Sequence, residues 1–147
     1  MHYIFLALAF LTGIAISIQA GVNSNLRLAL NNPLMASLIS FGTGFITLLI
    51  VHLTTSGAIP PMATLRSLSW WKWTGGVIGA IYVTTVILSV PRIGTANLVS
   101  LSVAGQLLAA VVLDHYGLLG FTQHSANVWR LLGIGLILAG VWLVVKN

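Results

Sequence analysis

Acidic residues are almost absent from this sequence, which has one, Asp114, beside six lysines and arginines. Only 5% of its residues are charged, whereas a soluble domain carries about 25%. A globule of 147 residues could not solvate a surface so poor in charge, and 58% of the chain is hydrophobic. The scarcity of charge therefore excludes an ordinary soluble domain. It predicts a single domain, residues 1–147, that uses lipid as its solvent.

Cysteine is missing altogether, which excludes disulfides and thiol chemistry. The basic residues stand singly, so no patch can follow phosphates and we expect no nucleic-acid partner. A carboxylate pair, a His/Cys metal set and a phosphate-binding loop are missing as well. Asp114 and His115 are neighbours, and neighbours on a helix point about 100° apart, so they form no catalytic dyad by spacing. We therefore expect no enzyme, no metal and no cofactor.

Long apolar runs dominate the rest of the chain, and each approaches the ~20 residues that span hydrocarbon. The first run lacks a basic start and an A-x-A site before Gly21, so we expect a retained helix and not a cleaved signal peptide. The sequence predicts an all-α integral membrane protein with five transmembrane helices, at about residues 3–29, 33–53, 70–90, 94–115 and 128–145.

Polar residues, prolines and tryptophans mark where these helices begin and end. An asparagine before Pro33 caps the second helix, and Asn127 or Ser125 caps the fifth. Pro91 is expected to end the third helix at Val90. Residues 54–69 form the longest polar stretch and predict a loop, and the following WWKW (residues 70–73) is typical of an interfacial anchor.

One stretch, GIAISIQAGVNSNLR (residues 13–27), combines apolar sequence with a cluster of amides. Gln19 and Asn23 are four apart and share a helix face, with Asn25 close by. Unsatisfied polar groups in lipid are costly, so these amides either bind a polar substrate or tie the first helix to a neighbour. Gln19 reaches the membrane interior only if the first helix continues past Ala20.

Polar residues in the fourth and third helices give further candidates. Gln106 lies near the middle of the fourth helix and either binds substrate or forms an interhelical hydrogen bond. Asn97 and Ser100 are three apart on the same helix, and they are binding residues or helix-start and packing residues. Tyr82 in the third helix stacks a substrate or belongs to the core.

Small residues at helical spacing predict close packing between helices. The second helix carries residues that are small and polar enough to lie between helices: Ser37, Ser40, Gly42, Thr43 and Gly44. Two small pairs four apart in the third helix have the same meaning: Gly75 with Gly79, and Gly76 with Ala80.

The only acid, Asp114, has two interpretations. A lone carboxylate could take up a proton and couple its movement to a substrate. Because Asp114 lies at a helix end near Arg130, it could instead form a salt bridge at the membrane surface.

The basic residues are divided evenly between the two membrane faces that five helices imply. Three lie on each face: Arg66, Lys72 and Arg130 on one, and Arg27, Arg92 and Lys146 on the other. An excess of basic residues on one face is what orients a membrane protein, and this chain lacks such an excess. We therefore predict that it inserts in both orientations and forms an antiparallel homodimer. In such a dimer Gln106 of one copy would reach the depth of Gln19 of the other. Two inverted copies would reproduce the inverted repeat of transporters.

The sequence resembles the half-size, five-helix YdcZ-type family of the drug/metabolite transporter superfamily. The resemblance covers nearly the whole chain, and five motifs carry it: QAGVNSNLR, SFGTGF, WWKWTGGVIGAIYV, PRIGTANLVSLSVAGQLLAAVVLDHYG and RLLGIGLILAGVWLV. It implies a bacterial inner-membrane exporter that works as a dimer of half-transporters. Related four-helix exporters exchange protons against cations at a carboxylate in the first helix. This chain has no acid in its first helix. Gln19 is the nearest polar counterpart by character, not by alignment, and an amide does not titrate.

These observations predict a secondary transporter that exports a small polar metabolite or drug-like molecule by alternating access. Its partners would be that small molecule, the lipid bilayer and a second copy of the chain or a sister half-transporter. The alternative is a membrane scaffold or accessory subunit that uses the same small-residue faces for contact.

Overall fold

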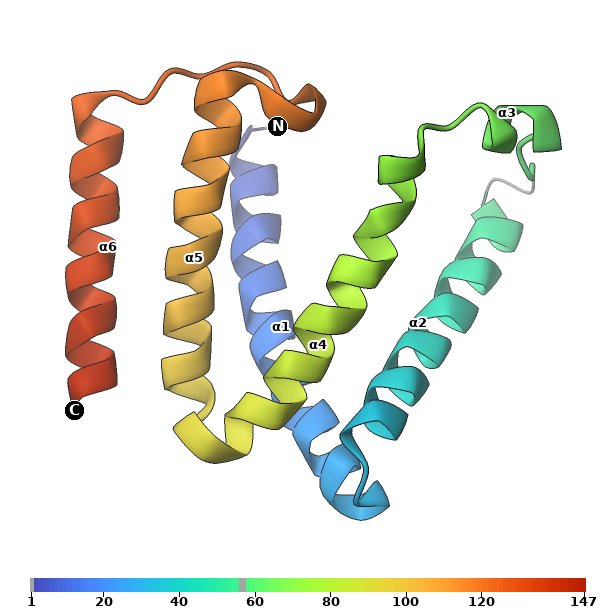
Figure 1. Ribbon diagram of the computed structural model, residues 1–147, viewed down its shortest axis with the longest axis horizontal. Helices are drawn as coiled ribbons and strands as arrows, with labels where there is room; N and C mark the ends of the chain where they lie inside the picture. The colour runs from blue at the N-terminus through green and yellow to red at the C-terminus, as the bar shows by residue number, and fades with distance from the viewer. Residues whose placement is uncertain (1, 56–57) are drawn as a thin grey trace. The chain divides into compact units, whose positions relative to one another are not determined.

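The computed structural model describes residues 2–55 and 58–147 of the chain (Figure 1). Residue 1 and residues 56–57, which fall in the predicted 54–69 loop, lie outside the described residues. Within the described ranges the structure consists of helices and connecting segments, without a strand. Five of its helices are long and apolar enough to cross a membrane: His2–Leu30, Pro33–Thr55, Trp70–Ile93, Thr95–Tyr116 and Val128–Lys146. The predicted all-α class with five apolar spans is confirmed.

The fold divides into two compact units, Met1–Arg92 and Ile93–Asn147. The described part of the first unit contains three long helices, a short helix and a 3-10 turn: α1 (His2–Leu30), α2 (Pro33–Thr55), α3 (Met62–Arg66), η1 (Trp70–Trp73) and α4 (Thr74–Ile93), of which the last residue belongs to the second unit. The second unit contains α5 (Thr95–Tyr116), η2 (Leu118–Gly120) and α6 (Val128–Lys146). That the whole chain forms one domain stays a prediction.

Helix α1 continues without interruption through Gly21 to Leu30. At 1.5 Å per residue its length is about 42 Å, which exceeds a hydrocarbon thickness of about 30 Å and requires a tilt. Gln19 consequently lies close to the midpoint of α1 and not at its end. The sequence predicted that Gln19 reaches the membrane interior only if the first helix continues past Ala20. The structure meets this condition.

A tight turn at Asn31 and Asn32 joins α1 to α2. Asn31 has a φ of 49°, a left-handed conformation that asparagine tolerates better than most residues and that ends a helix. The Asn32 side-chain oxygen accepts hydrogen bonds from the backbone N–H groups of Leu34 (3.0 Å) and Met35 (3.1 Å). The predicted asparagine cap before Pro33 is confirmed.

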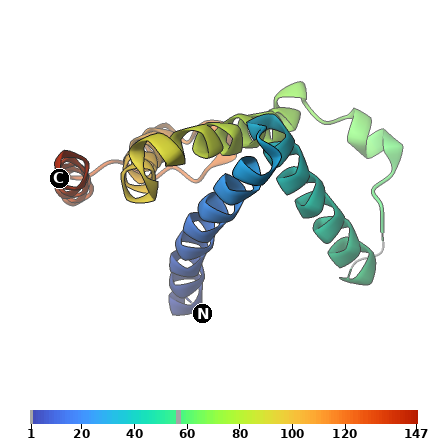
Figure 2. The ribbon, with the colours of Figure 1, turned by 90° about the horizontal axis from the view of Figure 1, so that it is seen from below.

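Helices α1 and α2 contact each other near this turn and diverge toward their other ends (Figure 2). The buried residues on the two helices are mostly small, which lets the backbones approach: Ala20, Asn23 and Ser24 on α1, and Ala36 and Ser37 on α2. An open wedge therefore follows from tight packing at one end of the pair.

Helix α4 joins the first unit through side-chain contacts with α2. The hydroxyl oxygens of Ser37 and Thr84 are 2.9 Å apart and share a hydrogen bond. A Cβ built on Gly79 would lie 3.5 Å from the ring of Phe41, whereas one on Gly75 or Gly76 would meet nothing within 4 Å. Of these three glycines only Gly79 therefore contacts a neighbouring helix, at an ordinary van der Waals distance from a side chain. The close backbone approach that the small pairs predicted is not found for α4 among the described residues.

One predicted helix end and one predicted loop differ from the structure. Helix α4 does not end before Pro91 but continues through it to Ile93. The proline lies in the last turn, where it removes one backbone donor and leaves most of the helix's hydrogen bonds intact. The helix ends before Gly94, whose φ is 80°. The predicted 54–69 loop contains the short helix α3, which begins directly after Pro61 because proline suits a helix start.

In the second unit α5 and α6 lie side by side and run in opposite directions (Figure 1). The left-handed Gly117, with a φ of 60°, ends α5. The Asn127 side-chain oxygen accepts a hydrogen bond of 2.8 Å from the backbone N–H of Arg130, so Asn127 is the cap of α6. Of the two predicted caps, Asn127 and not Ser125 is confirmed.

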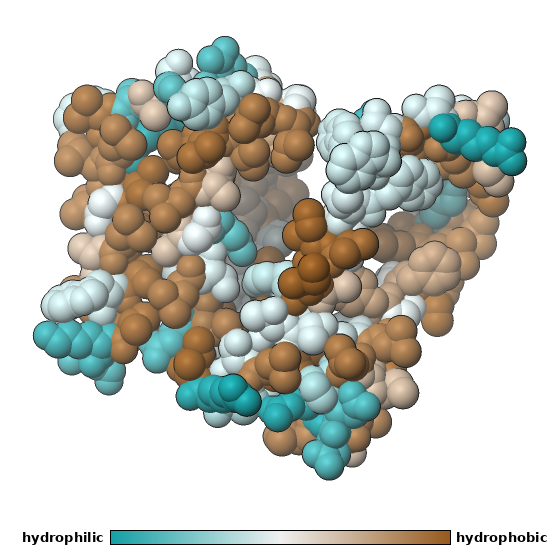
Figure 3. Space-filling view, in the orientation of Figure 1, coloured by the Kyte–Doolittle hydropathy of each residue, from teal (hydrophilic) through white to brown (hydrophobic). Residues whose placement is uncertain are grey.

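Most large apolar side chains of the described helices are exposed rather than buried, among them Tyr3, Phe5, Phe45, Leu48 and Leu136. On the face shown in Figure 3, hydrophobic side chains cover most of the helices, and strongly hydrophilic ones gather mainly near the helix ends. A soluble protein rarely exposes such continuous apolar surface. The exposed side chains suit contact with lipid along the five spans.

Candidate functional site

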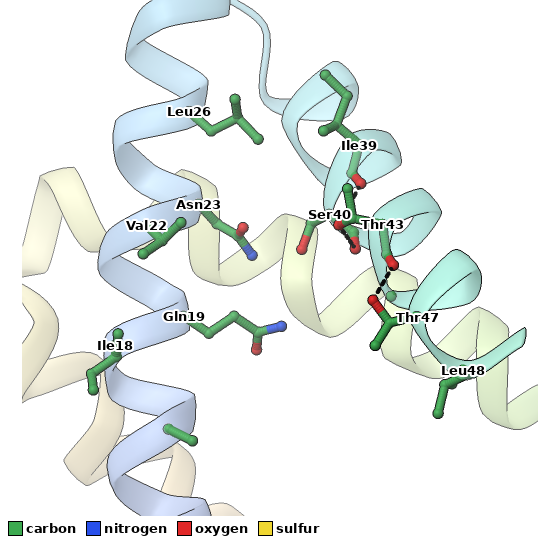
Figure 4. Close-up of a pocket in the computed structure, with 12 residues that line it drawn as sticks. Ile18, Gln19, Val22, Asn23, Leu26, Ile39, Ser40, Thr43, Thr47 and Leu48 are labelled. Atoms are coloured by element: carbon green, nitrogen blue, oxygen red, sulfur yellow. Dashed lines mark hydrogen bonds between the residues drawn. The ribbon is translucent and has the colours of Figure 1, made fainter. Parts of the chain in front are cut away.

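An open groove of about 760 Å³ runs between α1 and α2, where the two helices diverge (Figure 4). Its size falls within the range of about 300–1,000 Å³ typical of small-molecule sites. Apolar side chains form half of its lining: Ala15, Ile18, Val22, Leu26, Ile39 and Leu48. The other half is polar or glycine: Gln19 and Asn23 on α1, and Ser40, Thr43, Gly44 and Thr47 on α2.

Gln19 and Asn23 form the polar side of the groove on α1. They are one helical turn apart, and Figure 4 shows both side chains extending toward α2. Asn23 is only 5% exposed, whereas Gln19 is exposed. Neither amide forms a hydrogen bond with another residue in the part of the chain that the structure describes. Each therefore presents two N–H donors and a carbonyl oxygen to whatever occupies the groove.

Ser40, Thr43 and Thr47 form the opposite side on α2. The Thr43 hydroxyl lies 3.0 Å from the carbonyl oxygens of both Ile39 and Ser40, and that of Thr47 donates over 2.8 Å to the carbonyl of Thr43 (Figure 4). Because each hydroxyl has one proton, Thr43 and Thr47 can only accept hydrogen bonds from a ligand. The hydroxyl of Ser40 has no hydrogen-bond partner among the described residues and can both donate and accept.

The sequence did not single out this side of the groove. Ser40 and Thr43 were interpreted as packing residues of α2, and Thr47 was not named. Their spacing of three and four, with Gly44 between, places them on one helix face, which was the available signal. That this face meets the amides of α1 depends on the rotation of α2 about its own axis.

A second cavity of about 330 Å³ adjoins the groove on the side of α4. Gln19, Ser40 and Gly44 line both spaces, and Val83 of α4 lines the second. Gln19 therefore borders both volumes, which extend across three helices of the first unit.

The other predicted binding residues of the first unit lie outside both cavity linings. Asn25 is exposed, and its amide donates over 3.2 Å to the carbonyl of Gly21 in its own helix. Tyr82 is half-buried on α4. The structure thus brings Gln19 and Asn23 together and separates Asn25 and Tyr82 from them. Substrate contact by the latter two stays a prediction.

Asn97, Ser100 and Gln106 lie on α5, in the second unit. Asn97 and Ser100 are half-buried and Gln106 is exposed. Their predicted part in substrate binding, and the match in depth between Gln106 and Gln19 of another copy, stay predictions.

Asp114 lies at the end of α5 that faces the start of α6. Its carboxylate is 3.5 Å from a guanidinium nitrogen of Arg130, and the two side chains are 32% and 40% exposed. The same guanidinium donates to the carbonyl of His124, whose backbone N–H donates over 2.8 Å to the carbonyl of Asp114. The predicted salt bridge at a helix end is confirmed, and an exposed pair of this kind contributes at most about 1 kcal/mol. Proton coupling by Asp114 stays a prediction.

Comparison with known proteins adds the family to this geometry. The model of a family described as "Putative inner membrane exporter, YdcZ" matches residues 4–143. The inner membrane protein YdcZ of Escherichia coli strain K12 is similar to the chain, with 25% identity over 148 aligned positions that cover 97% of the chain and 96% of the relative. No solved structure matches the chain. The five apolar helices fit a multi-pass protein of the inner membrane. Because the family model spans nearly the whole sequence, this chain belongs to the YdcZ family of the inner membrane.

Proposed function

We propose that this protein is a secondary transporter that exports a small polar or drug-like molecule through the groove between α1 and α2. The observation that carries the proposal is Asn23, which is 5% exposed, faces the groove and has no hydrogen-bond partner in the described residues. A polar group in a membrane protein is costly unless it is satisfied, so it marks a functional site by default. The family description of an inner-membrane exporter supports the same class of function.

Transport by alternating access requires that the groove open to each side of the membrane in turn. We propose that two copies of the chain, inserted in opposite orientations, supply the two halves of the moving structure. The equal numbers of basic residues on the two predicted faces support this arrangement. In it, Gln106 of α5 in one copy completes the site formed by Gln19 and Asn23 in the other.

The proposed transport is tested with the purified chain in liposomes. We expect flux above that of protein-free liposomes for at least one solute in a broad panel of radiolabelled polar metabolites and drugs. Background flux for every member of the panel would contradict transport by this chain alone and favour a scaffold, an accessory subunit or a half-transporter that needs a sister chain. Reconstituting the chain together with a sister chain in the same liposomes would then identify the last case.

The antiparallel dimer is tested by the orientation of the chain in cells. We expect reporter tags at the two ends, each active on only one side of the membrane, to give comparable signals on both sides. A single fixed orientation, with one end always cytoplasmic, would contradict insertion in both directions. Adding three lysines to one predicted face serves as the control, because this bias should fix the orientation.

A further inference from the structure

The polar groups of the groove carry hydrogen-bonding capacity but no formal charge. Its polar lining consists of two amides and three hydroxyls, and none of its lining residues is a lysine, arginine, histidine or acid. A charged ligand that leaves water for such a site loses its hydration without gaining an opposite charge. An uncharged ligand loses only the hydration of its polar groups, and the amides and hydroxyls of the groove can replace those hydrogen bonds.

The positions of the charges in the whole chain agree with this lining. Four lie within three residues of the end of a long helix: Arg27, Arg92, Asp114 and Lys146. Arg130 lies in the first turn of α6, and Arg66 and Lys72 belong to the short segments α3 and η1. The central parts of the five spans therefore hold no formal charge. Any span that borders the groove, from the same copy or from a second one, brings no charge to its middle.

The two sides of the groove are complementary to different hydrogen-bonding groups on a ligand. Thr43 and Thr47 donate their only hydroxyl protons to backbone carbonyls of α2 and can only accept. A ligand that satisfies them needs an N–H or O–H donor. Gln19 and Asn23 present N–H groups as well as carbonyl oxygens, so the ligand also needs an acceptor. Apolar residues such as Ile18, Val22 and Leu48 contact the remainder of its surface.

We propose that the groove binds an uncharged molecule that carries both an N–H or O–H donor and a hydrogen-bond acceptor on an apolar frame. This inference names the ligand class of the transporter proposed above and rests on that proposal. A primary amide on a ring has this chemistry. A carboxylate lacks the donors, and an amidinium lacks the acceptor and carries a charge. A lipid tail would leave the nearly buried amide of Asn23 without a partner.

Three compounds of nearly the same shape and one larger analogue test the ligand class by equilibrium binding to the full-length protein in lipid nanodiscs. They are benzamide, benzoate, benzamidinium and N,N-dimethylbenzamide, which keeps the carbonyl of benzamide but has no N–H. We expect benzamide to bind, and each of the others to bind about tenfold more weakly or worse, because each leaves polar groups of the groove unpaired or brings in a charge. Failure of benzamide to bind, or equal binding of benzoate or benzamidinium, would overturn the proposal. Equal binding of N,N-dimethylbenzamide would overturn the part assigned to Thr43 and Thr47.

A gain of binding separates this inference from a mere loss of fold. Asn23→Asp places a carboxylate of the same shape in the groove, so we expect benzamidinium binding to strengthen by about tenfold and benzamide binding to weaken. The control is Asn31→Asp, which adds the same charge to the α1–α2 turn outside the groove and should leave the ranking of the four compounds unchanged. An unchanged ranking in Asn23→Asp would overturn the assignment of the site.

The outcomes of the flux and binding experiments are independent of one another. A protein that moves a charged solute in liposomes but does not prefer benzamide retains the proposed transport and loses the proposed ligand class. A protein that prefers benzamide but moves no solute retains the binding site and loses transport.

Discussion

Replacing Asn23 with leucine is expected to lower transport by roughly ten- to a hundredfold while leaving the protein folded. Leucine branches at the same carbon as asparagine but is larger and cannot form hydrogen bonds, so the groove loses its most buried polar group to an apolar side chain. An apolar residue is also favourable in a membrane helix, and we therefore expect normal insertion. The measurement is the initial rate of flux in liposomes for a solute that the unchanged protein moves.

Asn25→Leu is the informative comparison, because it removes the same side chain two residues further along α1. Asn25 is exposed and already donates to the carbonyl of Gly21, outside the lining of the groove. We expect a much smaller loss of flux than for Asn23→Leu. Equal losses of flux would contradict the groove as the binding site. They would indicate instead that both asparagines act through the C-terminal part of α1. Thermal unfolding of both variants checks that the comparison concerns transport and not stability.

The second large effect is expected from Gly44→Leu, which should block the groove by its volume. Gly44 lines both the groove and the adjoining cavity, and a Cβ built on it meets nothing within 4 Å. A Cβ therefore has room at this position, and the rest of a leucine side chain would extend into the groove or the adjoining cavity. We expect flux to fall by at least about tenfold, with little change in stability, because no packed core is disturbed.

Gly42→Leu is the matched control for this blocking. Gly42 lies two residues away on α2, a Cβ on it also meets nothing within 4 Å, and it does not line the groove. The two variants add the same apolar volume to the same helix, so any general effect on α2 appears in both. Flux that survives in Gly44→Leu, or that fails equally in Gly42→Leu, would contradict a transport path through the groove.

The two caps illustrate what a sequence can predict at short range. An asparagine before Pro33 and another before Val128 each bond a backbone N–H within three residues. Such interactions depend on a few consecutive residues, and so they appear in the sequence pattern itself. The end of α4 was predicted less well, since the hydrogen bonds around Pro91 outweighed the local disfavour of proline.

The two sides of the groove differ in how far they could be predicted. Gln19 and Asn23 stood out because amides are rare and costly in an apolar helix. Hydroxyls are a weaker signal of a binding site in the sequence. Serine and threonine can donate to the carbonyl one turn back, and they are common between membrane helices. Thr43 and Thr47 do form such bonds, yet their oxygens also face the groove.

The sequence by itself determined the solvent of this protein, its five apolar helices, their main caps and its family. Each of these follows from hydrophobic length, local hydrogen bonding or a pattern along the chain. Only the tertiary structure decided which faces meet. It placed Ser40, Thr43 and Thr47 opposite Gln19 and Asn23, and left Asn25 outside the groove. The reason is physical: the rotation of a membrane helix about its axis depends on packing against neighbours far away in the sequence, and hydropathy does not record it.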